Sequence, residues 1–279
     1  MPTTADEADR SVIDEAREAV RVERRRTADE REAFRAFRGR VESVPTEAVS
    51  PGGSPATAGV ADVTASPSGS GTPADARAGG PATPPGSGLV AVRDAYAETV
   101  MSVPHYEEEY DDTYERSVAA ELGPELAYAL TRGSGYHPEY GRALFDAVDD
   151  AIEERDRLVE RLRVETESLD RASSRLGAVR REIETLDATV PEGGFGALDA
   201  CRARAGVLVE DCDRIAARRQ RAIAEHGREL RLDDDVVDLP TYLYQNVSAT
   251  YPVLAAVGAV GDRLDGLTRR TERAMARVG

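Results

Sequence analysis

Apolar residues recur at alternating spacings of three and four from Leu144 to Val190, and the same spacing resumes at Leu198. This period places one continuous apolar stripe along an α-helix. The two stretches are separated by residues 191–196, PEGGFG, where proline ends a helix and glycine lets the chain reverse. We therefore predict an antiparallel coiled-coil hairpin over residues 138–231, with its turn near 191–196.

The composition limits how thick a core this chain can build. Aromatic residues make up 5% of the 279 residues, tryptophan is absent, and 32% of the residues are charged. The apolar content is mainly Ala, Val and Leu in helical register, and no segment has a convincing strand pattern. The predicted fold is all-α and elongated, without a β-sheet, and combines the coiled-coil hairpin with a small helical cap and a tethered N-terminal helix.

The other segments are distinguished by changes of composition. Residues 45–88 consist mostly of Pro, Gly, Ser, Ala and Thr, which is typical of disordered linkers. A flexible chain of this length would let the first helix pack on its own hairpin or on a second copy, and both remain open. We expect a disordered start (1–8), a long helix (9–44), the linker (45–88), a cap of short helices (89–135), the hairpin (138–231) and C-terminal helices (240–279).

Two polar residues, Arg155 and Glu165, interrupt the apolar stripe of the first hairpin helix. Antiparallel pairing from the turn outwards gives Glu165 two neighbours on the return helix, Arg219 and His226. A buried polar layer fixes helix register at some cost in stability, and we predict such a layer from Glu165, Arg219 and His226. The long N-terminal helix is also polar in the middle of its stripe, at Glu23, Thr27 and Glu30.

The chain carries a formal charge of −16, and all 36 basic residues are arginine. A dense carboxylate surface keeps a protein in solution in molar salt, so these features favour a salt-adapted protein; an ordinary acidic protein is the alternative. The first residues lack the basic and apolar regions of a signal peptide. The longest apolar run, residues 252–261, is about half of what a membrane-spanning helix needs. We therefore expect a cytoplasmic protein with no membrane partner.

Candidate residues for chemistry are few. Tyr106, Tyr110 and Tyr114 are predicted to share one helix face among carboxylates, either packed on neighbouring helices or forming an acidic docking surface. A di-iron site in a helical bundle needs Glu-x-x-His pairs on two helices, and none of the three histidines lies in one. Cys201 and Cys212, about 16 Å apart along one predicted helix, are expected to be small buried side chains. We predict no metal, no cofactor and no enzymatic activity.

The arginine clusters are interleaved with acids, and this pattern argues against nucleic-acid binding. Residues 9–42, for example, contain ten arginines and nine acids, the pattern of a salt-bridged solvent face. We expect a non-catalytic scaffold or protein-interaction protein that binds a protein partner or self-associates through its helices. The alternative is a nucleic-acid-associated or regulatory accessory protein that uses the arginine-rich last helix. The expected contact residues, within the chain or with a second copy, are Phe34, Phe37, Ile152 and Val159.

Three stretches resemble a known family: residues 91–110, AVRDAYAETVMSVPHYEEEY; residues 120–126, AELGPEL; and residues 242–254, YLYQNVSATYPVL. They are similar to an uncharacterised helical family of haloarchaea that is known only as a domain of unknown function. The resemblance covers most of the chain outside the linker. It implies a helical, salt-adapted protein and carries over no activity and no site residues.

Overall fold

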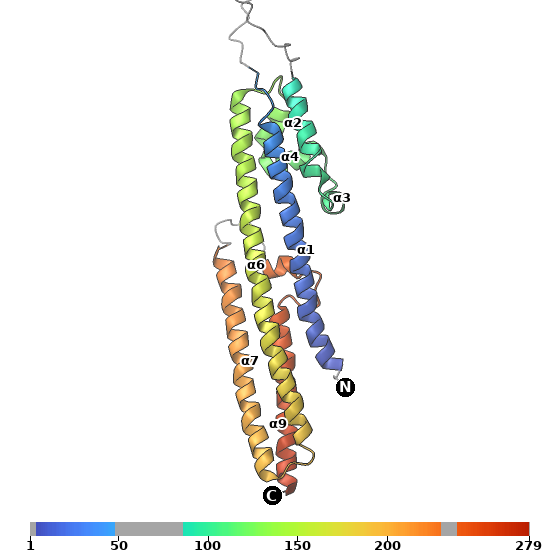
Figure 1. The fold of residues 1–279 in the computed structure, drawn as a ribbon, viewed down its shortest axis with the longest axis vertical. Helices are drawn as coiled ribbons and strands as arrows, with labels where there is room; N and C mark the ends of the chain where they lie inside the picture. Colours follow the sequence, from blue (N-terminus) through green and yellow to red (C-terminus); the bar gives the residue numbers. More distant parts are fainter. Residues whose placement is uncertain (1–3, 48–85, 230–238, 279) are drawn as a thin grey trace, which may run out of the picture. The chain divides into compact units, whose positions relative to one another are not determined.

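The computed structural model describes residues 4–47, 86–229 and 239–278 (Figure 1). Within these ranges the chain is all-α, as predicted, and the described residues form no strand. The helices are α1 (Thr4–Val41), α2 (Ser87–Ala97), α3 (Tyr106–Glu109), α4 (Tyr114–Leu122), α5 (Pro124–Arg132), α6 (Pro138–Thr189), α7 (Phe195–Glu229), α8 (Leu239–Leu243) and α9 (Pro252–Val278), with a 3-10 turn η1 (Val100–Ser102) after α2. Among these helices, none is both long enough and apolar enough to cross a membrane.

Helix α1 starts before the predicted boundary. It begins at Thr4 and ends at Val41, where residues 1–8 were predicted to be disordered and the helix to run over 9–44. Most of the predicted linker lies outside the described residues.

Helices α6 and α7 are the two predicted arms, joined by a turn at residues 190–194. Gly193 allows a close approach in this turn, because a Cβ there would lie 3.1 Å from the Thr189 carbonyl oxygen and 3.2 Å from Leu198 Cδ2, tighter than an ordinary van der Waals contact. The arms do not form an isolated two-helix coiled coil. Their buried stripes face a core that they share with α1 and α9, and α7 packs directly against α9. A continuous apolar stripe therefore predicted each helix but not the number of its partners.

The chain divides into two compact units, and both α1 and α6 contribute to each of them. Unit 1 contains residues 1–28 and 156–279, and unit 2 contains residues 29–155. These units do not follow the predicted segment boundaries, because the long helices run through both. The buried core of unit 1 includes Ile13, Val20, Leu162, Leu169, Leu176, Leu198, Leu208, Ile215, Tyr244, Val253, Val260 and Leu264.

The core of unit 2 is built around Tyr96 of α2. The rings of Phe34 and Phe37 meet it edge-on, with centroids 6.5 and 5.2 Å away, and Tyr114 meets it from α4 at 5.6 Å. Edge-to-face pairs of this kind add to the free energy of burial. Helix α1 thus packs on its own chain here, which is one of the two arrangements that the sequence left open. The aliphatic part of this core includes Val41, Val92, Val118, Leu122, Leu130, Leu144 and Val148.

The acidic segment before Gly123 forms two short helices, α3 and α4, and not the single helix on which Tyr106, Tyr110 and Tyr114 were predicted to share a face. Asp111 has a positive φ of 40°, which interrupts the helix between α3 and α4. The Thr113 hydroxyl then accepts a hydrogen bond from the Arg116 backbone N–H and caps α4. Threonine at this position satisfies an amide that would otherwise lack a partner, so a new helix starts there. The prediction that Tyr106, Tyr110 and Tyr114 share one helix face was therefore wrong.

Candidate functional site

The structure brings Glu165 of α6 and Arg219 of α7 together in the core of unit 1. Arg219 donates hydrogen bonds from Nη1 to Glu165 Oε2 at 2.7 Å and from Nη2 to Glu165 Oε1 at 2.6 Å. Both side chains are only 2% exposed. This bidentate geometry is the strongest arrangement of an arginine on a carboxylate, and it holds the two helices in one register. His226 lies on α7, but its side chain is outside the described residues.

Two further residues complete this layer, and the sequence did not single out either of them. The buried Tyr244 hydroxyl, just after α8, donates to Glu165 Oε1, and the Ser168 hydroxyl accepts from Arg219 Nη1 at 3.1 Å. Burial and the neighbouring Glu165 carboxylate raise the pKa of Tyr244, so the phenol stays protonated. We call Glu165, Arg219, Tyr244 and Ser168 the polar layer.

An arginine-lined groove runs beside the polar layer along α6 and α7. It consists of two adjoining hollows of about 230 and 400 Å³, which share Arg175, Ile215 and Arg218. Ala172, Leu208 and Ala222 contribute apolar lining. We call this the arginine groove, and its charged lining residues are Arg171, Arg175, Arg204, Arg214, Arg218 and Arg219 together with Glu182 and Asp211.

Most of these arginines already have an acidic neighbour. Arg204 pairs with Glu182, and Arg214 pairs with Asp211. Among the described residues, no carboxylate pairs with Arg175 or Arg218, and Nε of the buried Arg219 has no hydrogen-bond partner. The groove therefore combines an apolar lining with unpaired positive charge, on a chain whose net charge is −16.

Unit 2 contains a second buried charge cluster, centred on Glu30 of α1. Glu30 Oε2 accepts from Arg155 Nε at 3.1 Å, and Glu30 Oε1 accepts from His105 Nε2 at 3.0 Å and from the Tyr110 hydroxyl at 3.1 Å. Arg155 also donates from Nη2 to both oxygens of Glu121, at 2.9 and 2.8 Å, and its guanidinium lies 4.6 Å from the Phe34 ring centroid. One carboxylate thus links three different segments of the chain.

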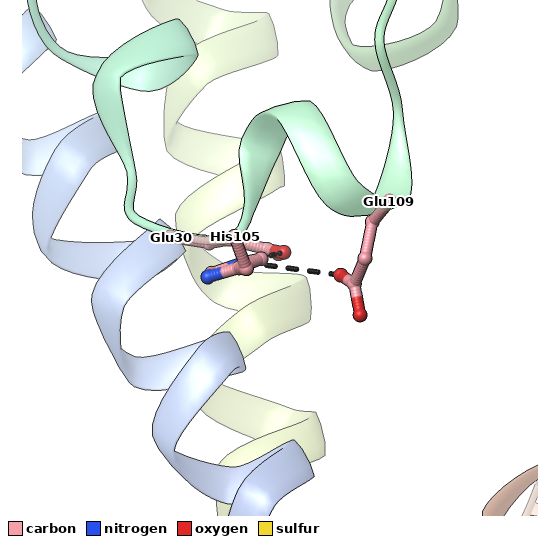
Figure 2. A group of neighbouring side chains, drawn as sticks. All are labelled: Glu30, His105 and Glu109. Atoms are coloured by element: carbon pink, nitrogen blue, oxygen red, sulfur yellow. Dashed lines mark hydrogen bonds and ion pairs between the residues drawn. The ribbon is translucent and has the colours of Figure 1, made fainter.

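Glu109 extends this cluster at the end of α3 (Figure 2). Its Oε2 lies 4.0 Å from His105 Nε2, and one donor atom each from Glu30, His105 and Glu109 fall within 4.8 Å of one another. The His105 side chain is buried, while the side chains of Glu30 and Glu109 are 16% and 29% exposed. We call these three residues the His105 cluster.

A small hollow of about 60 Å³ adjoins the His105 cluster and is lined by Glu30, Tyr106, Tyr110, Glu121 and Arg155. The buried Tyr106 hydroxyl interacts with Ser117 only outside standard hydrogen-bond geometry, and no other described residue bonds to it. Burial raises the pKa of both Tyr106 and Tyr110, and it also raises the pKa of Glu121 although Arg155 acts in the opposite direction. The phenols therefore stay neutral, and the hollow has room for one or two water molecules.

The residues expected to form a contact surface are mostly inside the protein. Phe34 and Phe37 are 1% and 0% exposed, so they are not available to a partner and pack within the chain. They are buried because Tyr96 and the aliphatic core of unit 2 cover them. Ile152 packs partly buried against the same core, and Val159 is half-buried in unit 1.

The three tyrosines and two cysteines singled out in the sequence are also mostly buried. Tyr106 is buried and Tyr114 half-buried, whereas Tyr110 is 43% exposed and is the member of this set that a partner could reach. Cys201 and Cys212 are free, buried thiols. Burial raises the pKa of Cys212 to about 11, so the thiol has little tendency to react.

One sequence signal could have located the cluster around Glu30. Glu30 and Arg155 are polar residues of opposite charge on otherwise apolar stripes of two helices, and the structure pairs them. Glu23, another polar residue of the α1 stripe, accepts from the Tyr242 hydroxyl at 2.8 Å, and the Thr27 hydroxyl donates to the Glu23 carbonyl at 2.9 Å. Interruptions of an apolar stripe are thus satisfied by one another, by their own helix or, for Glu23, by a side chain of another helix.

Residues 11–268 match the model of a protein family described as a domain of unknown function, DUF7260. The chain belongs to this family. The resemblance inferred from the three sequence stretches is therefore confirmed as far as an uncharacterised helical family is concerned. No curated protein and no solved structure matches the chain.

Proposed function

We propose that this protein is a non-catalytic helical scaffold that binds acidic, partly apolar segments of a partner protein in the arginine groove. The observation that carries this proposal is the presence of Arg175 and Arg218, unpaired among the described residues, beside the apolar side chains of Ile215 and Ala172. Arginine clusters recognise acidic segments through their guanidinium groups, and an apolar lining provides contact area for the other face of such a segment.

The buried polar groups support a structural function in preference to a catalytic one. Both oxygens of Glu165 accept hydrogen bonds from other side chains, and Tyr244 stays protonated. A general acid or base must be able to exchange its proton with a substrate, and burial among fixed partners opposes that exchange. Such a layer stabilises one helix arrangement, as a scaffold needs.

The charge balance is consistent with the proposed partner and with a salt-rich cytoplasm. In molar salt the Debye length is about 3 Å, so arginines act on a partner only at direct contact. A groove that combines guanidinium groups with an apolar lining retains affinity under these conditions, because apolar burial does not depend on charge attraction. Long-range attraction of a nucleic acid would be lost.

Fluorescence anisotropy tests the proposal with two labelled probes on the full chain. One probe is an amphipathic peptide with glutamate on one helix face and leucine on the other, and the second is a DNA duplex. We expect the peptide to bind, and the double substitution Arg175→Glu/Arg218→Glu to weaken binding at least about tenfold, which corresponds to about 1.4 kcal/mol.

The matched control is Arg269→Glu/Arg273→Glu on the exposed face of α9, which makes the same change of charge outside the groove. This control should leave peptide binding unchanged. Absence of peptide binding, or equal losses in the two double variants, would contradict the proposal. DNA binding that disappears only in the α9 variant would instead favour the nucleic-acid alternative. Circular dichroism shows whether each variant keeps its helices.

A further inference from the structure

We propose that the His105 cluster in unit 2 is a binding site for one divalent transition metal ion, with Zn²⁺ as the best match. This inference goes beyond the scaffold proposal, since it concerns different residues in the other compact unit. It also goes beyond the sequence, which places Glu30 and His105 75 residues apart.

The spacing of the donor atoms matches what zinc requires. Zinc binds imidazole nitrogen and carboxylate oxygen at about 2.1 Å, so two ligand atoms of a tetrahedral site lie about 3.4 Å apart. His105 Nε2 lies 3.0 Å from Glu30 Oε1 and 4.0 Å from Glu109 Oε2, and the three donor atoms fit within 4.8 Å. Shifts of a few tenths of an ångström to about an ångström would bring all three to coordination distance. Zinc would bind the Nε2 lone pair of neutral His105, so the single ring proton of the imidazole would sit on Nδ1 and the hydrogen bond from Nε2 to Glu30 would be replaced by the metal.

The local charge is suited to a divalent cation. Three carboxylates, from Glu30, Glu109 and Glu121, and the Arg155 guanidinium leave a net charge of −2 when His105 is neutral. Arg155 binds Glu30 through Oε2 and so directs Oε1 towards His105. Metal sites typically contain residues that do not touch the metal but hydrogen-bond to its ligands and so orient them. Arg155 is a positioning residue here, and Glu30, His105 and Glu109 are the ligands.

A second observation points to a small ligand at the same place. The hollow beside Glu30 is lined by Tyr106 and Ser117, and the buried Tyr106 hydroxyl makes only a weak interaction with Ser117, outside standard hydrogen-bond geometry. A zinc ion with three protein ligands keeps a fourth position for water. At about 60 Å³ the hollow can hold such a water but is much smaller than the pockets that bind organic substrates. The site therefore suits a metal with bound solvent.

Isothermal titration of the metal-free full chain with ZnCl₂ tests this inference. We expect about one zinc per chain, and we expect His105→Gln and Glu109→Gln each to weaken zinc binding about tenfold or more. The control is Glu107→Gln, which removes a similar exposed carboxylate from α3 outside the cluster and should leave affinity unchanged. MgCl₂ should not compete, because Mg²⁺ prefers ligand sets made only of oxygen.

Two additional measurements keep the result interpretable. The visible spectrum of bound Co²⁺ should change in His105→Gln, because the spectrum depends on which atoms coordinate the metal. The double variant Cys201→Ala/Cys212→Ala is the control for binding by thiols and should bind zinc like the unmodified chain. Because Glu109 lies at the surface, Glu109→Gln provides an answer even if His105→Gln fails to fold. Absence of stoichiometric zinc binding, or equal affinities in Glu109→Gln and Glu107→Gln, would overturn the inference. Neither outcome affects the peptide-binding test of the arginine groove.

Discussion

Both compact units bury an arginine against carboxylates, but water reaches the two clusters to different extents. Arg219 and Glu165 in unit 1 are each 2% exposed, whereas Arg155 and Glu30 in unit 2 are 12% and 16% exposed. In unit 1 both oxygens of the carboxylate are bonded within the helical core. In unit 2 the carboxylate side chains of Glu30 and Glu109, beside the buried His105, are 16% and 29% exposed. A closed ion pair stabilises an arrangement of helices, while a partly open one can also exchange a ligand with solvent.

Removing the arginine from each cluster should lower the free energy of unfolding by clearly different amounts, and this is the largest difference that we expect between the two units. We expect Arg219→Ala to lower the free energy of unfolding by about 3 to 5 kcal/mol, because it leaves a buried carboxylate without its counter-charge. We expect Arg155→Ala to cost about 1 to 3 kcal/mol, since water can reach Glu30 and Glu121. Urea denaturation monitored by circular dichroism measures both. Arg221→Ala, on the exposed face of α7, is the control and should change stability by less than about 0.5 kcal/mol. Equal costs at Arg219 and Arg155 would show that the two clusters do not differ in solvent access.

Two tyrosines in or near α8 allow a second comparison, in which each substitution removes a single hydroxyl group and the expected loss of stability is smaller. Tyr244 is buried and donates to the ionised Glu165, whereas Tyr242 is 45% exposed and donates to Glu23. Tyr244→Phe should cost about 1.5 to 3 kcal/mol, because it removes a hydrogen bond to a buried charge. Tyr242→Phe should cost less than about 1 kcal/mol, because water replaces the lost bond. Thermal unfolding of the two variants measures the difference, and similar melting temperatures would contradict a contribution of Tyr244 to the polar layer.

Stability should fall at alkaline pH in both units. Burial raises the pKa of Tyr244 in unit 1 and of Tyr96 in unit 2, and it raises the pKa of Tyr114 to about 12. The unfolded chain releases these protons near pH 10 and the folded chain releases them only at higher pH, so the contribution of these tyrosines to stability is constant below about pH 9 and decreases above pH 10. At pH 11 each fully buried phenol contributes about 1.4 kcal/mol to this loss. Phenolate absorbance recorded together with circular dichroism measures it. Ionisation of all tyrosines near pH 10 without unfolding would exclude this effect.

Removing an exposed ion pair between helices should change the free energy of unfolding least of all. The change should be similar in the two units. Arg204 pairs with Glu182 in unit 1, and Arg38 pairs with Asp149 in unit 2, all at the surface. We expect Arg204→Ala and Arg38→Ala each to leave the free energy of unfolding nearly unchanged at moderate salt, because water and salt screen such pairs. Chemical denaturation at low and at molar salt measures this. A cost of several kcal/mol would show that surface pairs contribute as much as the buried clusters.

Sequence periodicity was sufficient for the parts of the fold that depend on one helix and its nearest neighbour in the chain. The apolar stripe predicted α6 and α7, and residues 191–196 predicted their reversal. Glu165 and Arg219 could be paired from the register alone, because a tight turn links positions on the two arms by simple counting. Sequence reasoning about Tyr106, Tyr110 and Tyr114 failed because a positive φ at Asp111 and a cap at Thr113 depend on local backbone energies that apolar spacing does not contain.

By itself, the sequence thus determined the helical class, the arms of the hairpin and the presence of charged interruptions in apolar stripes. Only the tertiary structure decided that α1 and α9 share the core of α6 and α7, that Tyr244 joins Glu165, and that His105 meets Glu30 and Glu109. The physical reason is that helix formation follows a local period of 3.6 residues, whereas these contacts join residues that are distant in the chain. Their geometry comes from how whole helices pack, and packing depends on side-chain shape across several elements at once.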